Sequence, residues 1–195
     1  MHPALNQNAY FVKEHTGIFK ASNNYDIYNP HTQELTLTCR EENLGILTRL
    51  LRFSDYKRMT PFRIEVRTAA GEKVLTVRRG VAFFVSTVEV LDENDEVIGK
   101  LKQKFFSLGG KFNVFDAHDN YLFALQGEWA SWEFKFVKDS LEFAQVSKQW
   151  AGMGKELFTT ADNYMLSITD HVPQDNNLRT LILGSIMCID MVLKE

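Results

Sequence analysis

The stretch LRTLILGSIMCIDMVLKE, residues 178–195, decides the fold because it is the most apolar segment of the chain and still carries charges. A transmembrane helix needs about 20 apolar residues, whereas Arg179 and Asp190 bracket only ten uncharged positions here. A helix on a membrane surface needs a polar face, and apolar residues cover most of this one. A helix that is apolar all round belongs inside a protein. We therefore predict a buried core helix, with a membrane span as the alternative.

The predicted core helix would direct its apolar side chains at surrounding strands and place an aspartate near one mouth of the core. Gly184 and Ser185 are small, so strand side chains would approach the helix closely there. The predicted buried-helix residues are Leu181, Leu183, Ile186, Met187, Ile189 and Asp190.

Residues 60–170 alternate between apolar and polar side chains, which is typical of half-buried strands. In FRIEVRT, residues 62–68, Phe62, Ile64 and Val66 share one face. Similar segments follow, separated by the turn-forming strings AAGE, ENDE, SLGG, AHDN and KDS. Short strands with tight turns and no intervening helix predict an all-β fold, an antiparallel barrel that is closed or nearly closed. The core helix would occupy its lumen.

Two further features accompany the strand pattern. Leucines at helical spacing within residues 42–56, with acids before and bases after them, predict a surface helix. The strings VIGKLKQKF (97–105) and EFAQVSKQW (142–150) form a weak internal repeat, in which Ile98 matches Phe143 and Leu101 matches Val146. The repeat favours a barrel built by duplication, and strand periodicity alone is the alternative.

Composition and length predict a single domain over residues 1–195. Hydrophobic residues make up 45% and charged residues 24%, which are values of a globular protein. A net charge of −3 does not indicate nucleic-acid binding, which is typical of basic domains. The two cysteines, Cys39 and Cys188, lie in apolar patterns, so a reducing compartment is expected. No signal-peptide pattern is found in MHPALNQNAYFVKEH, and we expect a cytoplasmic protein, peripheral to the membrane if it binds one.

Three strings carry a resemblance to the phospholipid scramblase family, which shares its fold with tubby C-terminal domains and LURP-one-related proteins. They are TPFRIEVRTAAGEKVLTVRRG (60–80), VLDENDEVIGKLKQKF (90–105), and KELFTTADNYMLSITDHV (155–172) followed by the terminal helix. The resemblance implies a barrel of about twelve strands around a central hydrophobic helix. Members are described as calcium-activated movers of phospholipid between leaflets, or as lipid- and phosphoinositide-responsive adaptors.

The family's proposed calcium segment resembles the stretch that contains Asp162 and Asn163, and Asp170 is the nearest closing acid. Thr160 stands where the family has its leading aspartate. Because calcium requires six to eight oxygen ligands, the loss of one carboxylate weakens such a site. The alternative is a turn or bulge in which both side chains bind local backbone amides. Calcium is the only cofactor that the sequence suggests.

Basic residues at alternating positions suggest a lipid-binding face for anionic headgroups. Adjacent phenylalanines near turns suggest exposed rings, because neighbours in a strand point to opposite faces. The alternative for the lysines is that they keep the outer face of a strand soluble. The predicted lipid-binding residues are Arg78, Arg79, Lys100, Lys102, Lys104, Phe83, Phe84 and Phe106.

Enzyme signatures are absent from the sequence. GMGKE lacks the residues of a phosphate loop, and no Gly-x-Ser-x-Gly, Cys-x-x-Cys or His-x-x-x-His pattern occurs. We therefore predict a non-enzymatic, scramblase-like protein that binds phospholipid, with transbilayer movement of phospholipid as the finer hypothesis. The alternative is a soluble lipid- or protein-binding adaptor without transport. The expected partner is an anionic phospholipid or membrane surface, and the sequence points to no particular protein partner or oligomeric state.

Overall fold

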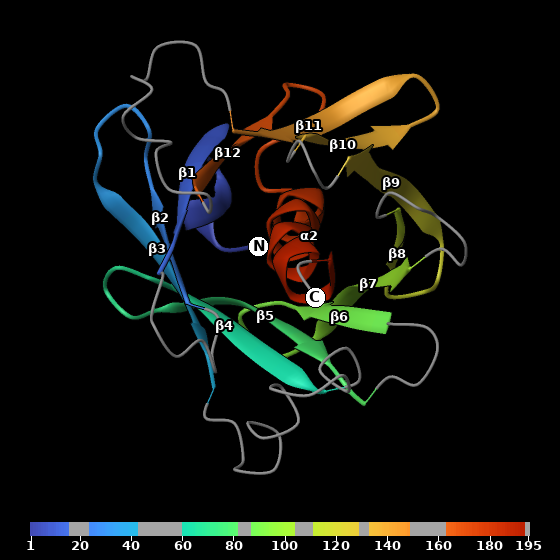
Figure 1. The fold of residues 1–195 in the computed structure, drawn as a ribbon, viewed down its shortest axis with the longest axis horizontal. Coiled ribbons are helices and arrows are strands. Elements are labelled where there is room, and N and C mark those ends of the chain that lie inside the picture. Colours follow the sequence, from blue (N-terminus) through green and yellow to red (C-terminus); the bar gives the residue numbers. More distant parts are fainter. Residues whose placement is uncertain are drawn as a thin grey trace.

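Twelve antiparallel strands of the described residues close into one barrel around helix α2 in the computed structural model (Figure 1). The structure describes residues 1–15, 24–42, 60–81, 87–103, 111–128, 133–148 and 163–193. Each strand pairs with its neighbour in sequence, and β1 pairs with β12 to close the barrel. The predicted barrel around a C-terminal helix is therefore confirmed.

The elements follow one another as a meander. A short 3₁₀ helix, η1 (Pro3–Leu5), precedes the strands, and α2 (Asn177–Leu193) ends the chain. The strands are β1 (Ala9–Glu14), β2 (Tyr25–Tyr28), β3 (Leu35–Glu41), β4 (Phe62–Thr68), β5 (Lys73–Arg79), β6 (Thr87–Leu91), β7 (Val97–Gln103), β8 (Phe112–Asp116), β9 (Tyr121–Glu128), β10 (Glu133–Lys138), β11 (Leu141–Ser147) and β12 (Asn163–Ile168). The predicted surface helix of residues 42–56 lies, apart from Glu42, outside the described residues.

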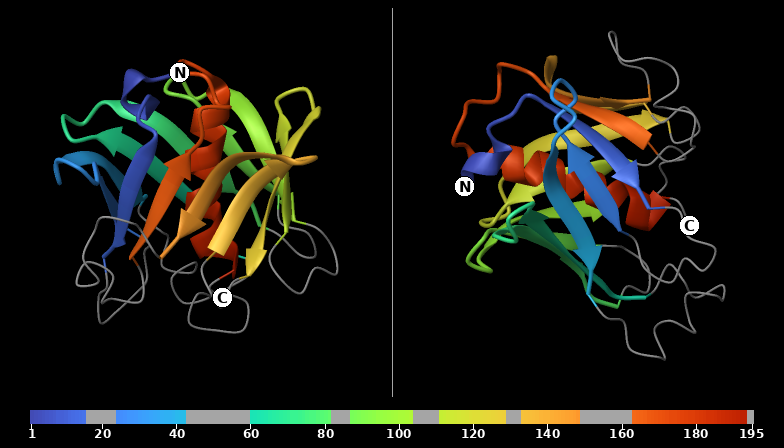
Figure 2. Two further views of the ribbon diagram at one scale, coloured as in Figure 1. Left: turned by 90° about the horizontal axis from the view of Figure 1, so that it is seen from above. Right: turned by 90° about the vertical axis from the view of Figure 1, so that its left-hand side faces the viewer.

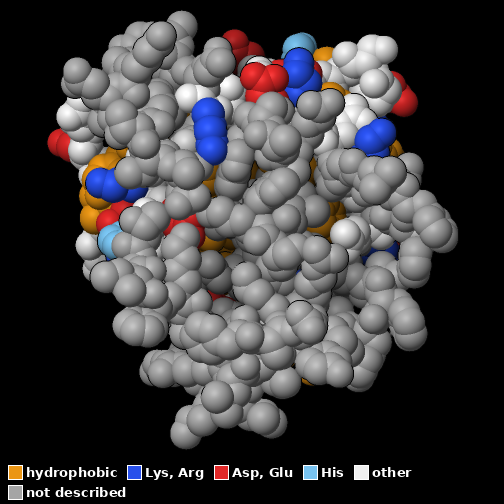
Figure 3. Space-filling model, viewed as in Figure 1, with side chains coloured by type: hydrophobic (Ala, Val, Ile, Leu, Met, Phe, Trp, Pro, Cys, Tyr) orange, Lys and Arg blue, Asp and Glu red, His pale blue; other side chains and the backbone are white. Residues whose placement is uncertain are grey.

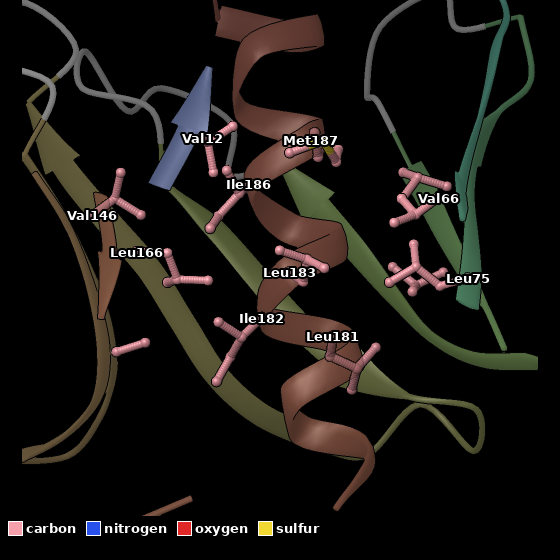
Figure 4. Packing of buried hydrophobic residues seen from close by; sticks show 14 of the residues in the cluster. Val12, Val66, Leu75, Val146, Leu166, Leu181, Ile182, Leu183, Ile186 and Met187 are labelled. Carbon is pink, nitrogen blue, oxygen red and sulfur yellow. The ribbon is translucent and has the colours of Figure 1, made fainter. Parts of the chain in front are cut away.

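Helix α2 runs along the lumen of the barrel and supplies the centre of its core. Leu181, Leu183, Ile186 and Met187 are each no more than 1% exposed. Its side chains extend towards strands on several sides, with Val66 and Leu75 on one side and Val146 and Leu166 on another (Figure 4). Ile189 and Asp190 belong to α2, but their side chains lie outside the described part. Among the described residues no helix has the length and apolar character that a bilayer span requires.

Two glycines permit the close contact between α2 and the barrel wall. A Cβ atom at Gly184 would lie 2.9 Å from both methyl carbons of Val90 in β6. A Cβ atom at Gly99 in β7 would lie 2.6 Å from a methyl carbon of Leu181 in α2. Carbon atoms do not approach one another so closely without displacement. The predicted close approach of strand side chains at Gly184 is thus confirmed.

Five of the twelve strand pairs carry a register shift next to the turn that joins them. The shift in the β6–β7 hairpin leaves Ile98 as the extra residue, and the shift in β10–β11 leaves Phe143. Both side chains are partly buried against the core. The weak internal repeat therefore matches two bulged strands at equivalent places in their hairpins, which explains why Ile98 and Phe143 align.

The barrel mouth at which α2 begins is closed by a buried arginine. Arg179 is 2% exposed, although it lies in the first turn of the helix. Its guanidinium donates hydrogen bonds to the backbone oxygens of Leu5, Gln7, Val172 and Pro173 and to the side-chain oxygen of Asn8. The N-terminal segment thereby joins the connection between β12 and α2 at this mouth, while α2 runs towards the opposite end (Figure 2).

Candidate functional site

Two of the predicted lysines lie together on the outer face of β7. Lys100 Nζ is 3.3 Å from Asp119 Oδ2, and Lys102 Nζ is 3.0 Å from Asp119 Oδ1. Residues 100 and 102 share a face because side chains along a strand alternate, and Leu101 between them is fully buried. Asp119 lies in the turn between β8 and β9, so its carboxylate binds two ammonium groups from β7.

Aromatic rings lie beside these lysines. Lys102 Nζ lies 4.8 Å from the centre of the Phe115 ring, and Phe115 meets Tyr121 edge to face with 6.0 Å between ring centres. Lys138 Nζ lies 5.9 Å from the centre of the Tyr121 ring. We call the set Lys100, Lys102, Phe115, Tyr121 and Lys138 the lysine–aromatic face. It combines side chains from four consecutive strands, β7 to β10, which lie side by side in Figure 1.

A β-bulge turns Tyr121 to the outside of the barrel. In β9, Phe123 pairs with Val114 and Tyr121 pairs with Phe115, so Leu122 is the extra residue. Without it, Tyr121 and Phe123 would share a face, because they are two positions apart. Phe123 is 1% exposed and Tyr121 is 42% exposed. The bulge thus adds an exposed tyrosine to the lysine–aromatic face.

The acids around the lysine–aromatic face are held by hydrogen bonds. The pKa of Asp119 lies below its usual range because the Lys102 and Lys100 ammonium groups donate hydrogen bonds to its carboxylate. The pKa of Asp116 is lowered mainly by hydrogen bonds from the Asn120 side chain and backbone. Asp116 faces its own turn, with Oδ1 accepting from the backbone N–H groups of His118 and Asn120. Both carboxylates are therefore ionised at neutral pH, and Asp119 is the one that contacts the lysines.

The Arg78 side chain is on the outer surface of the barrel. Arg78, Glu89 and Lys100 pair with one another across β5, β6 and β7 and so form one row. Arg78 Nε donates to Glu89 Oε2 at 2.8 Å, and Glu89 stands between Arg78 and Lys100 in the row. The cation of Arg78 is therefore offset by an adjacent acid. In the view along the barrel, acidic and basic side chains both lie near the edge of the molecule among the described residues (Figure 3).

The structure corrects the placement of Arg79 beside Arg78 on one lipid-binding face. Arg79 is 4% exposed, lies 4.8 Å from the centre of the Phe62 ring and donates to the backbone oxygen of Thr60. Neighbours in a strand point to opposite faces, so only one of two adjacent arginines can reach the outer surface. Arg79 therefore belongs to the interior of the barrel and is not part of the lysine–aromatic face.

The structure separates the described residues of the predicted calcium site. Asn163 begins β12 and is buried, whereas Asp170 is exposed beyond the end of that strand and accepts a hydrogen bond from Asn8. A six-residue strand is about 17 Å long, and calcium–oxygen distances are about 2.3–2.6 Å. Asn163 and Asp170 therefore do not share one ion. Asp162 lies outside the described residues, and no metal-binding group of three or more His, Cys, Asp or Glu forms within the described ranges.

Four predicted lipid-binding residues, Phe83, Phe84, Lys104 and Phe106, lie outside the described residues. Conversely, sequence reasoning missed Phe115, Tyr121 and Lys138. The string FNVFD contained a signal for Phe115, because Phe112 and Val114 are buried and alternation turns Phe115 outwards. The position of Tyr121 depends on the bulge, for which the sequence offers no comparable signal.

Comparisons with known proteins agree with this fold. The family model described as Scramblase matches residues 5–195. Human phospholipid scramblase family member 5 is 23% identical over 193 residues, and human phospholipid scramblase 2 is 20% identical over 192 residues. These alignments cover 90% and 91% of this chain, which spans 68% and 62% of the respective relatives. An X-ray structure of a protein from Arabidopsis thaliana superposes with a TM-score of 0.56 at 13% identity, covering 100% of this chain and 97% of that one.

Proposed function

Because this chain belongs to the Scramblase family, we propose that it binds the surface of phospholipid membranes through the lysine–aromatic face. The observation that carries the proposal is the contact of Lys102 and Lys138 with the rings of Phe115 and Tyr121. Tyrosine rings favour the membrane–water interface, where their apolar body and polar tip are both accommodated. Lysines beside them attract anionic headgroups. The arrangement therefore offers both interactions that a peripheral protein needs.

The magnitude of this attraction is modest and depends on several residues together. Each lysine near an anionic membrane surface contributes about 1 kcal/mol, and the effect falls off within a Debye length. Three lysines against the single carboxylate of Asp119 leave two net positive charges on this face, which contribute about 2 kcal/mol. The exposed part of Tyr121 adds apolar burial. Such binding is reversible and weakens as salt is added.

We further propose that the protein moves phospholipid between leaflets, and that this movement takes place along the outer surface of the barrel. Full burial of a Leu or Ile side chain is worth about 1.5–3 kcal/mol, and α2 carries several such residues at the centre of the core. A domain has only about 5–15 kcal/mol of stability in total. Withdrawal of α2 into a bilayer would therefore unfold the barrel. Headgroups would instead move along the outer surface, with the lysine–aromatic face as their contact.

We expect the double substitution Lys102→Ala/Lys138→Ala to weaken binding to mixed phosphatidylcholine–phosphatidylserine vesicles by about 30-fold. The loss of two interfacial charges at about 1 kcal/mol each gives this factor. Flotation of the purified protein with vesicles, in calcium and in chelator, measures it.

The matched control removes two cations from the opposite wall of the barrel. Arg40 and Arg67 lie on β3 and β4, across the barrel from β9, and pair with Asp26 and Glu65. Arg40→Ala/Arg67→Ala changes the net charge equally, so it should weaken flotation much less. Equal weakening by both pairs would show a general charge effect and contradict the proposed face. A wild-type protein that stays folded but never floats would instead favour a soluble adaptor.

Lipid movement needs a separate measurement. In vesicles that carry a fluorescent phospholipid, dithionite bleaches the outer leaflet only, unless lipid moves between leaflets. We expect addition of the wild-type protein to raise the bleached fraction above that of protein-free vesicles, and Lys102→Ala/Lys138→Ala to reduce this gain. Binding without any rise would restrict the function to membrane attachment.

A further inference from the structure

We propose that the Asp119 carboxylate occupies the place of a ligand phosphate, and that it is displaced when Lys100 and Lys102 bind the phosphate group of a lipid headgroup. The inference rests on the proposed function, because it names the chemical class that the lysine–aromatic face recognises. Asp119 would act as an internal competitor that limits binding to other anions.

The two ammonium groups are arranged to bind two oxygens of one anion. Lys100 Nζ contacts Oδ2 and Lys102 Nζ contacts Oδ1, so each lysine holds a different oxygen of one anion. A phosphate group also presents two oxygens on one side, at a similar spacing. Its charge is up to twice that of a carboxylate, and charge-assisted contacts with lysine strengthen accordingly. The same pair of lysines therefore suits a phosphate better than it suits Asp119.

Lys102 has a second contact that keeps it in position when the Asp119 carboxylate is displaced. Lys102 Nζ lies 4.8 Å from the centre of the Phe115 ring, a contact independent of Asp119. Phe115 pairs directly with Lys100 across β7 and β8, and Lys102 lies two residues further along β7. The aromatic ring thus holds a cation at the site in the absence of the carboxylate.

Displacement of the Asp119 carboxylate requires only rotation of its side chain. The backbone N–H of Asp119 donates to Asp116 O at 3.2 Å, and the Asp116 carboxylate binds the N–H groups of His118 and Asn120. The turn is therefore held without the Asp119 carboxylate. The Asp119 side chain is 54% exposed, and exposed ion pairs contribute little to stability.

The turn between β6 and β7 resembles the Asp119 turn but lacks a cation held over an aromatic ring among the described residues. Asp95, in the β6–β7 turn, has a φ of 65°, and Asp119 has a φ of 62°. The N–H of Asp95 donates to the backbone oxygen of Asp92, three residues earlier, as the N–H of Asp119 donates to that of Asp116. Its carboxylate also binds two cations, Lys73 and Arg63. Neither of these cations lies over an aromatic ring within the described residues. Asp95 is therefore the control for the loss of one turn carboxylate.

The test is the substitution Asp119→Asn, which removes the charge and keeps the side-chain shape. Asparagine also tolerates the positive φ of this position. We expect binding to vesicles of phosphatidylcholine and phosphatidic acid, which exposes a phosphate, to tighten about fivefold. Binding to phosphatidylcholine alone should stay unchanged. In a Lys100→Ala/Lys102→Ala background the gain should disappear. Failure of Asp119→Asn to tighten binding, or an equal gain from Asp95→Asn, would overturn the proposal.

A second measurement separates this inference from the proposed function and distinguishes a headgroup from free phosphate. Titration with inorganic phosphate, followed by NMR of the Asn120 amide and the lysine side chains, needs no membrane. We expect Asp119→Asn to shift these signals at several-fold lower phosphate than the wild type. If that occurs while the wild type never floats with vesicles, the phosphate site stands and the membrane function fails. If vesicles bind but neither phosphate nor Asp119→Asn has an effect, the phosphate site fails and the membrane function stands.

Discussion

Replacing Arg179 by methionine is expected to lower the free energy of unfolding by about 3–5 kcal/mol. The guanidinium donates to four backbone oxygens and to the side chain of Asn8, and two of these hydrogen bonds are fully buried. A buried oxygen that loses its donor costs about 1–3 kcal/mol. Methionine fills a similar volume but donates to none of them. The loss is a large part of the stability of a domain.

Urea denaturation measures this effect, and a constant slope with denaturant would show that the unfolded state is unchanged. Arg179→Lys keeps the charge but has three donors in a compact ammonium, so it should fall between the wild type and Arg179→Met. Arg63→Met is the control for removing an arginine, because Arg63 is an outer residue that pairs with Glu42 and Asp95. It should cost less than about 1 kcal/mol. An Arg179→Met protein as stable as Arg63→Met would contradict the role of Arg179 at the barrel mouth.

The substitution Gly184→Leu is expected to destabilise the protein by about 3 kcal/mol or more, beyond the usual range for added core methylenes. A Cβ atom at position 184 already lies 2.9 Å from both Val90 methyl carbons and 3.5 Å from a methyl carbon of Val77. The rest of a leucine side chain has no space between α2 and the wall formed by β5 and β6. The helix-forming advantage of leucine over glycine is only about 1 kcal/mol and does not offset this clash.

Thermal unfolding followed by circular dichroism tests this expectation. In Gly184→Leu/Val90→Ala the removed methyl groups should recover part of the loss, and the two sites should be non-additive because they are in contact. Gly80→Leu is the control, since a Cβ atom at Gly80 has no atom within 4 Å among those described. If Gly184→Leu were no more harmful than Gly80→Leu, the close contact between α2 and β6 would not be rigid.

Alternation of apolar and polar residues predicted strands between residues 60 and 170, where β4 to β12 lie. Phe62, Ile64 and Val66 are buried, as their spacing indicated. The same rule applied within β5 separates Arg78 from Arg79, which the sequence interpretation had grouped by adjacency. Local periodicity therefore decides which way a side chain points from a regular strand. Local periodicity does not decide which side chains of other strands that side chain contacts.

The lysine–aromatic face depends on contacts between strands, which local periodicity does not predict. Lys102, Phe115, Tyr121 and Lys138 come from four strands, and their contacts depend on register and on the bulge at Leu122. A bulge shifts every side chain after it to the other face, and it depends on how two strands pair. The sharing of Asp119 by two lysines depends on the same pairing.

The sequence by itself determined the all-β fold and the burial of its last helix. Both follow from local patterns. Strand alternation requires one buried face, and a helix that is apolar all round but shorter than a bilayer span favours a protein interior. Tertiary structure alone decided the partners of Arg179, which lie up to 174 residues away, and the separation of Asn163 from Asp170. It also decided which cations, rings and acids meet on the outer wall. Those relations depend on closure and register, which follow from the free energy of the whole barrel and not from any one segment.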